Sequence, residues 1–133
     1  MHSQSAVVFI TGAGKRVGAA LAVLLHERGY RIALHYRQAK AEAQAVADDL
    51  NAKRADSCFL LQADLAISAE RDALIAQIIA HYGQLDVLIN NAGITMRALF
   101  NDVDIDVLKQ LMDVNFWGMV YCTKYALPYL LES

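Results

Sequence analysis

Residues 11–18 read Thr-Gly-Ala-Gly-Lys-Arg-Val-Gly, and their place in the chain decides the fold. The apolar run 6–11 precedes this stretch, and a segment with apolar residues at helical spacing, 16–28, follows it. A strand that turns on glycines into a helix offers free backbone N–H groups and the positive end of a helix dipole to a phosphate. The alternative is an ordinary strand-to-helix turn with one glycine used for packing.

Around this turn, short apolar strands alternate with helices. Further strands are expected at 31–36, 57–62 and 85–90. Strict alternation predicts a parallel sheet with right-handed crossovers. The sequence therefore predicts one α/β domain over 1–133, an open Rossmann-type sheet of order 3-2-1-4 with helices on both faces. Ligands of such sheets bind beyond the carboxyl ends of the strands, where every motif of this chain falls.

The expected helices are amphipathic. The helix at 16–28 is expected to bury the stripe Val17, Ala20, Leu21, Leu24 and Leu25. The helix at 39–53 is expected to bury Ala43, Val46, Ala47 and Leu50. Ser68 is expected to cap a third helix, which runs to about Tyr82 and stops at Gly83. Asp102 or Asp104 opens a long final helix, which Pro128 is expected to kink or end.

The final helix carries two apolar faces. Its inner stripe is expected to be Leu108, Leu111, Met112, Phe116, Met119, Val120 and Thr123, with Asn115 on the same stripe. A second face carries an aromatic row, Trp117, Tyr121 and Tyr125. Both faces cannot be solvated in a stable monomer, and strand 85–90 would form a sheet edge guarded only by Asp86. We therefore expect a homo-oligomer through the final helix.

Composition excludes several classes of protein. The net charge is −2 and no basic tract occurs, so nucleic acid is not an expected partner. The first apolar run is too short for a signal peptide or a membrane span, and residues 1–5 carry no basic region. Cys58 and Cys122 lack metal-site spacing, so we expect two buried thiols, no metal and a cytoplasmic location.

The end of the second strand predicts which dinucleotide binds. Sites specific for NAD place an Asp or Glu there to bind the ribose 2′-OH. This chain has no acid at 34–41 and instead has His35, Arg37 and Lys40, with Lys15 and Arg16 in the glycine turn. Guanidinium groups bind a 2′-phosphate well, so NADP(H) is the expected cofactor. The alternative is a solvated basic loop.

With these strands and helices around it, the stretch 11–18 resembles the T-G-x-x-x-G-x-G motif of the short-chain dehydrogenase/reductase family, with Arg16 in place of the middle glycine. The resemblance covers essentially the whole chain and implies an NADP(H)-dependent oxidoreductase. Together with the glycine turn, it implies the following cofactor-binding residues: Thr11, Gly12, Gly14, Lys15, Arg16, Val17, Gly18, Tyr36, Arg37, Asp64, Leu65, Asn90, Ala92 and Gly93.

The resemblance also implies individual roles. Asp64 would meet the adenine amino group, and the run Asn90-Asn91-Ala92-Gly93 would support the sheet and pass close to the ribose. Asn115, within Val-Asn-Phe-Trp-Gly, would hold a water in the proton relay. Each has an ordinary alternative: Asp64 as the cap of a turn, the asparagines as turn formers, and Asn115 as a buried amide bonded to backbone.

Within the family, Leu34-His35-Tyr36-Arg37, Gln62-Ala63-Asp64-Leu65 and Arg16 resemble pteridine reductases over about the first half of the chain. Gly93 stands where those enzymes usually have serine, and from there the chain looks more like a general carbonyl reductase. The resemblance thus implies NADPH-dependent reduction of a carbonyl or a pterin-like ring, with a small-molecule substrate.

The family's chemistry uses a tyrosine, a lysine four residues later, and a serine from a fifth strand. The only tyrosine with a lysine at that spacing is Tyr36, with Lys40, at the adenosine end of the site, and we interpret this pair as a chance match. We therefore expect this chain alone to be inactive. A non-catalytic NADP(H)-binding module and one half of a split enzyme remain the alternatives.

Overall fold

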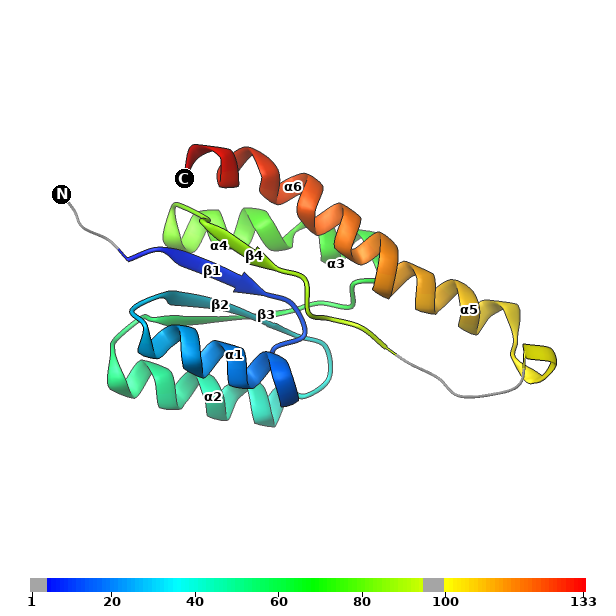
Figure 1. Cartoon of the computed structure of the whole chain (residues 1–133), viewed down its shortest axis with the longest axis horizontal. Helices are drawn as coiled ribbons and strands as arrows, with labels where there is room; N and C mark the ends of the chain where they lie inside the picture. Colours follow the sequence, from blue (N-terminus) through cyan, green and yellow to red (C-terminus); the bar gives the residue numbers. More distant parts are fainter. Residues whose placement is uncertain (1–4, 95–99) are drawn as a thin grey trace.

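Four parallel strands form one sheet in the computed structural model, which describes residues 5–94 and 100–133 (Figure 1). The strands are β1 (Val7–Ile10), β2 (Arg31–Tyr36), β3 (Cys58–Gln62) and β4 (Val87–Ile89). Their order is β3-β2-β1-β4, and Phe9 of β1 pairs with Ala33 on one side and with Leu88 on the other. The predicted fold class and strand order are confirmed. Residues 1–4, where no signal peptide is expected, lie outside the described residues.

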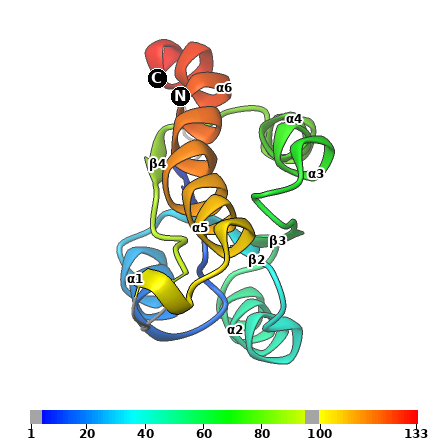
Figure 2. The same ribbon diagram turned by 90° about the vertical axis from the view of Figure 1, so that its right-hand side faces the viewer.

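Helices cover both faces of the sheet, as predicted (Figures 1 and 2). On one face, α1 (Arg16–Glu27) and α2 (Lys40–Lys53) pack over Val8 and Ile10 of β1. On the other, α4 (Leu74–Tyr82) and α6 (Met119–Glu132) pack over Val7 and Phe9, and the short helix α3 (Ser68–Asp72) lies against both of them. Because successive side chains of β1 point to opposite faces, this four-residue strand joins two separate cores.

The predicted apolar stripe of α1 is right only in part. Leu21 and Leu25 pack against the core on this face of the sheet, whereas Val17, Ala20 and Leu24 are exposed. The fully buried positions are instead Gly18, Ala22 and His26, and the two small residues let this helix approach the rest of the fold closely. The prediction for α2 is confirmed: Ala43, Ala47 and Leu50 are buried, and Val46 packs against them.

The helix expected at 68–82 is two helices, α3 and α4, separated at Ala73. Ser68 is the first residue of α3 and not its cap, which is Ile67. The Ser68 Oγ instead accepts a hydrogen bond from Nη2 of the buried Arg71, 3.2 Å away. The Arg71 guanidinium lies 3.7 Å from the centre of the Tyr121 ring on α6, which ties α3 to the last helix. The predicted stop at Gly83 is confirmed by its left-handed conformation after α4.

The final helical segment is also interrupted. After a 3₁₀ turn, Phe100–Asp102, come α5 (Ile105–Met112), a π-helical turn at Asp113–Gly118, and α6. Asp104 is the residue before α5, although its side chain makes no capping hydrogen bond. Pro128 does not end the segment, since α6 continues to Glu132. In Figure 1, α5 projects past the carboxyl ends of the strands.

The predicted inner stripe of this segment is wrong. Met112, Phe116, Met119 and Val120 are exposed, and the buried residues are Val114, Gly118, Cys122 and Ala126. The buried positions recur every four residues but include Gly118 and Ala126, so the size of the apolar side chains does not mark the inner face. The second face is as predicted: the rings of Trp117, Tyr121 and Tyr125 follow one another at 6.1 and 6.3 Å.

Three further expectations concern the cysteines, Asp86 and the possibility of a membrane span. Cys58 and Cys122 are free and buried, and burial raises the pKa values of their thiols to about 12 and about 11, which keeps them protonated. Asp86 does not guard the outer edge of β4, because its carboxylate accepts the backbone N–H of Val7 at 2.7 Å. Within the described residues, no helix is long and apolar enough to span a membrane.

A polar cluster closes the edge of the sheet at the amino ends of the strands. His26 Nε2 lies 2.7 Å from Ser57 Oγ, and both residues are buried. Arg54 donates to the carbonyl oxygens of His26 and Tyr30. Burial, together with the charges of Arg54 and Lys53, lowers the pKa of His26. The native structure therefore favours a neutral His26.

We predict that acid weakens the fold below about pH 6.5, the ordinary pKa of histidine. The pKa values of His26 and His35 are both lowered, mainly by burial, so the unfolded chain binds more protons than the native chain in acid. The stability that they contribute is complete above that pH and is lost as the pH falls through the native pKa values. Urea unfolding between about pH 8 and 5 measures this loss, and His26→Gln should reduce its slope. A fold that grows more stable on acidification through this window would contradict the prediction.

Candidate dinucleotide site

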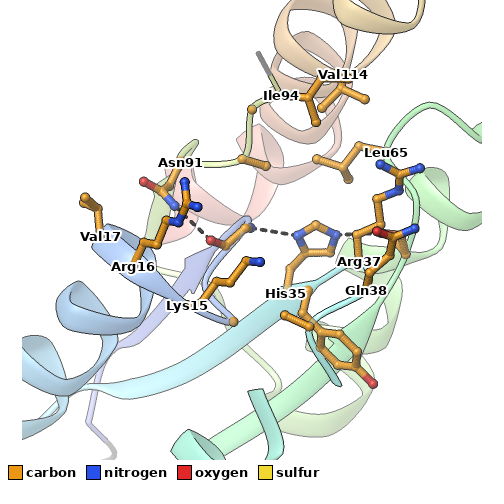
Figure 3. Close-up of a pocket in the computed structure, with 17 residues that line it drawn as sticks. Lys15, Arg16, Val17, His35, Arg37, Gln38, Leu65, Asn91, Ile94 and Val114 are labelled. Atoms are coloured by element: carbon orange, nitrogen blue, oxygen red, sulfur yellow. Dashed lines mark hydrogen bonds between the residues drawn. The ribbon is translucent and has the colours of Figure 1, made fainter. Parts of the chain in front are cut away.

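A cleft of about 450 Å³ opens where the carboxyl ends of the four strands meet. Its walls come from the glycine turn after β1, the ends of β2 and β3, the segment after β4, and the π turn (Figure 3). Of the residues predicted to bind the cofactor, these line it: Gly12, Gly14, Lys15, Arg16, Val17, Tyr36, Arg37, Leu65, Ala92 and Gly93. The structure adds His35, Gln38, Ala39, Ala63, Asn91, Ile94 and Val114.

The glycine turn lies against the segment after β4 without room for side chains. Gly12 has φ +65°, and a Cβ there would come within 2.7 Å of Ala92 Cα. A Cβ on Gly18 would come within 2.5 Å of the Gly12 carbonyl oxygen and 2.6 Å of Asn91 Nδ2. Both positions therefore require glycine, one for its backbone conformation and both for space.

Beyond the turn, α1 begins with unsatisfied donors. Lys15 precedes the helix and its side chain makes no capping hydrogen bond, while the first N–H groups of a helix have no acceptor inside it. An anion at this helix end would accept those hydrogen bonds and gain from the helix dipole. The cradle of small residues at Gly12, Gly14 and Ala92 leaves space for the approach of a pyrophosphate.

Arg16 occupies the slot of the missing middle glycine in a strained conformation. Its φ is +58°, in the left-handed region, which costs a residue other than glycine about 1–2 kcal/mol. This backbone conformation places the guanidinium group of Arg16 at the cleft (Figure 3).

Thr11 connects the glycine turn to the end of β4. Its buried Oγ1 accepts the backbone N–H groups of Asn91 and Ala92, each at 3.0 Å. Asn91 Nδ2 donates in turn to the Gly12 carbonyl oxygen at 3.0 Å. Thr11 and Gly18 thus do not line the cleft but hold together the two segments that do.

Of the two asparagines after β4, sequence analysis assigned Asn90 to the cofactor, but the structure places its neighbour at the cleft. Asn90 Nδ2 donates to Thr123 Oγ1 of α6 at 3.1 Å, and Asn90 is not among the lining residues. The alternation of side chains between the two faces of β4 could have predicted this position of Asn90. Leu88 packs into the core below α6, and Asn90, two residues on, faces the same side.

His35 is buried at the end of β2 and both of its ring nitrogens are bonded. Nδ1 accepts the Gly12 N–H at 2.8 Å, and Nε2 lies 2.8 Å from the Ala63 carbonyl oxygen (Figure 3). Because a backbone N–H can only donate and a carbonyl can only accept, the ring is neutral with its proton on Nε2. Burial also lowers the pKa of His35. Sequence analysis grouped His35 with the cations of this strand end, and that assignment is wrong.

Three cationic side chains, Lys15, Arg16 and Arg37, line the cleft. Arg37 Nε lies 3.5 Å from Asp64 Oδ2, and the exposed Lys15 and Arg16 lie in the turn. Lys40 is exposed at the start of α2 and is not a lining residue. Asp64 Oδ1 accepts the Ala66 N–H at 2.9 Å, so this aspartate caps a turn, as its ordinary alternative held. Among the described residues that line the cleft there is no Asp or Glu.

Asn115 in the π turn joins the helical segment to the chain after β4. Its Oδ1 accepts the Ile94 N–H and its Nδ2 donates to the Ile94 carbonyl oxygen, both at 2.8 Å. This matches the alternative in which the amide bonds to backbone, although the side chain is exposed and the partner lies 21 residues away. The relay role of Asn115 stays a prediction.

Tyr36 and Lys40 lie in different environments. Tyr36 is buried at the end of β2, whereas Lys40 is exposed on α2, and the interpretation of the pair as a chance match stays a prediction. Within the described residues no group of three His, Cys, Asp or Glu side chains gathers to hold a metal.

A parallel sheet of order 3-2-1-4 whose glycine turn opens a helix at the ligand cleft defines a Rossmann-type nucleotide-binding domain. The chain belongs to the short-chain dehydrogenase family, whose sequence model, "short chain dehydrogenase", matches residues 6–133. This is a family of oxidoreductases that use nicotinamide cofactors.

Two groups of relatives are similar to this chain. The 3-oxoacyl-(acyl-carrier-protein) reductase FabG of Staphylococcus aureus is 37% identical over 124 residues, which cover 93% of this chain and 50% of the relative. The 11-beta-hydroxysteroid dehydrogenase A of Arachis hypogaea is 40% identical over 128 residues, 96% of this chain and 36% of the relative. Its counterpart 1A of Arabidopsis thaliana is 38% identical over 128 residues. The chain thus spans half or less of the length of these relatives.

We predict that Thr11→Val lowers the free energy of unfolding by about 2 kcal/mol, since two buried N–H groups lose their acceptor. Valine has the shape of threonine without the oxygen, so packing is preserved. Thr11→Ser keeps the acceptor and should lose less stability. Denaturant unfolding of both variants measures the difference. If Thr11→Val unfolds like Thr11→Ser, the hydroxyl does not hold β4 to the turn.

Proposed function

We propose that this cleft binds NADP(H) in preference to NAD(H), and that the protein uses it as an NADPH-dependent reductase of carbonyl substrates. One observation carries the cofactor preference. Lys15, Arg16 and Arg37 line the cleft, and none of its described lining residues is acidic. An acid at the end of β2 would repel a 2′-phosphate, whereas arginine binds it through charge and paired hydrogen bonds.

The lining residues divide by position. The residues from Gly14 to Val17 at the start of α1 would bind the pyrophosphate, and Arg37 after β2 would bind the 2′-phosphate. Leu65, after β3, would contact the adenine, with Asp64 beside it. Gly93, Ile94 and Val114 line the cleft on the side of the π turn. When bound, the nicotinamide supplies the hydride, while these residues bind and orient it.

The carbonyl substrate rests on the named relatives, a 3-oxoacyl reductase and hydroxysteroid dehydrogenases. A pterin-like ring is the second candidate, favoured by Arg16 in the glycine slot and by the run Leu34–Arg37. The rate of NADPH oxidation by the whole protein, measured once with carbonyl substrates and once with pterins, distinguishes the two candidate substrate classes. Turnover of neither class would reject both substrates and leave cofactor binding as a separate question.

We predict that NADPH binds more tightly than NADH, and that Arg37→Asp reverses or abolishes this preference. The substitution removes a guanidinium and places a carboxylate against the 2′-phosphate, while Asp64 loses its ion-pair partner. Calorimetric titration of both cofactors measures the ratio of affinities. Arg28→Asp, which makes the same charge change on an exposed residue after α1, should leave the ratio unchanged. Equal affinities in the unmodified chain would reject the preference.

We propose that a second copy of the chain covers the aromatic row of the last helix. Trp117 and Tyr125 are 43% and 40% exposed, and Met112, Phe116 and Met119 extend the exposed apolar surface. Exposed apolar patches of this kind mark interaction surfaces on soluble proteins. A helix that packs against its own symmetry mate would remove both copies of the row from water.

We predict that sedimentation over a concentration series shows an oligomer, and that Trp117→Glu shifts it toward monomer. A carboxylate at the end of the row would be buried unpaired in the interface. Leu24→Glu serves as the control, since Leu24 is a comparably exposed apolar residue on α1, on the other face of the sheet. An equal shift in both variants, or a monomer at every concentration, would contradict the proposal.

A further inference from the structure

His35 is the buried titratable residue of the cleft to which the proposed function gives no role. Its side chain is 2% exposed and lies in the middle of the site, between the glycine turn and the ends of β2 and β3 (Figure 3). It cannot contribute charge to the 2′-phosphate, because both ring nitrogens are engaged and the ring is neutral. Its contacts point to another role.

His35 binds two successive peptide groups of the glycine turn. Its Nδ1 accepts the N–H of Gly12, and its backbone carbonyl accepts the N–H of Ala13, both at 2.8 Å. On its other side, Nε2–H donates to the Ala63 carbonyl oxygen at the end of β3. One residue of β2 therefore connects the carboxyl ends of β1, β2 and β3.

These bonds fix the part of the turn that has the least freedom. Gly12 is in the left-handed region and touches Ala92, so its N–H must be satisfied inside the protein. Because His35 accepts the N–H groups of Gly12 and Ala13, the donors left for an anion are those farther along, at the start of α1. Without this support the turn would be held only from the β4 side, by Thr11 and Asn91.

We propose that His35 is a positioning residue for the pyrophosphate of the bound dinucleotide, acting through the Gly12 N–H to set the direction of the N-terminus of α1. This inference rests on the proposed function, because it takes the cleft to be a dinucleotide site. It extends that function by assigning separate residues to separate parts of the ligand: His35 to the pyrophosphate and Arg37 to the 2′-phosphate.

The division of roles has a measurable signature. The pyrophosphate is common to NADPH and NADH, so loss of the His35 side chain should weaken both cofactors by the same factor. We expect His35→Ala to bind each about tenfold more weakly, the factor that loss of a hydrogen bond with a buried partner left unsatisfied produces. Loss of Arg37, by contrast, should weaken NADPH alone.

Protonation gives a second signature. A protonated ring would place an N–H against the Gly12 N–H, so acid should break this contact. The charged residues that line the cleft with His35 are Lys15 and Arg16 in the turn and Arg37 after β2, and Asp64 lies after β3; the segment Asn91–Ile94 adds none. Burial lowers the pKa of His35, while the bond to the Ala63 carbonyl and the charge of Asp64 raise it less. The affinity for NADH, which has no 2′-phosphate to titrate, should therefore fall as the pH drops through the acid range below about 6.5, the ordinary pKa of histidine.

Three variants of the full chain test the inference by calorimetric titration with NADPH and NADH. His35→Ala removes the ring, whereas His35→Asn places an amide oxygen where Nδ1 accepts the Gly12 N–H. The asparagine variant should keep affinities within about threefold of the unmodified chain and lose the acid-dependent decline. His26→Gln, at the opposite edge of the sheet, changes another buried histidine and should leave both affinities unchanged.

The outcomes separate the inference from the proposed function. If the unmodified chain binds NADPH but His35→Ala leaves NADH binding intact, the inference is overturned and the proposed function stands. If His35→Ala does not fold, the asparagine variant decides: an unchanged acid-dependent decline in NADH affinity overturns the inference, and its disappearance supports it. If the unmodified chain binds neither cofactor, the proposed function itself fails.

Discussion

The site depends on one constraint, the attachment of the glycine turn to a strand end on each side. From β2, the ring and the carbonyl of His35 accept the N–H groups of Gly12 and Ala13. From the segment after β4, the Asn91 side chain donates to the Gly12 carbonyl, and the backbone N–H groups of Asn91 and Ala92 donate to Thr11 Oγ1. Because the turn is held on both sides, the orientation of α1 relative to the carboxyl ends of the strands is fixed, and so is the direction of the free N–H groups at the start of that helix.

The strands and their order could be predicted because their signals are local. Each strand contains a run of at least three consecutive apolar residues, and the alternation of strands and helices restricts the topology. The buried face of α2 could be predicted from apolar spacing, but those of α1 and of the last helical segment could not. At Gly18 and Ala22, and again at Gly118 and Ala126, these helices contact the rest of the fold through small residues, while larger apolar side chains remain exposed. Close packing favours small side chains at such contacts, and hydrophobicity alone does not report this.

Polar residues were predicted as members of the site but not in their roles. Asn90 and Asn91 are the same residue type at adjacent positions, yet one bonds to α6 and the other to the glycine turn. Sequence analysis placed His35 with Arg37 and Lys40 as a basic residue, whereas in the structure it is a neutral ring with both nitrogens hydrogen-bonded. The partner that decides each role lies more than 20 residues away in the chain, so no local pattern contains it.

Arg16 shows how strain and charge combine at this cleft. The left-handed conformation is unfavourable for arginine whether or not a ligand is present, and glycine would adopt it without cost. In the proposed dinucleotide site the guanidinium would interact with an anion in the cleft, and the cost to the free fold would be offset on binding. Strain at a residue that lines a cleft is the pattern expected of a binding site and not of a structural turn. Lys15 and Arg37 line the same cleft, whereas both ring nitrogens of the neutral His35 are bonded to backbone, so His35 would support the turn without competing for the ligand.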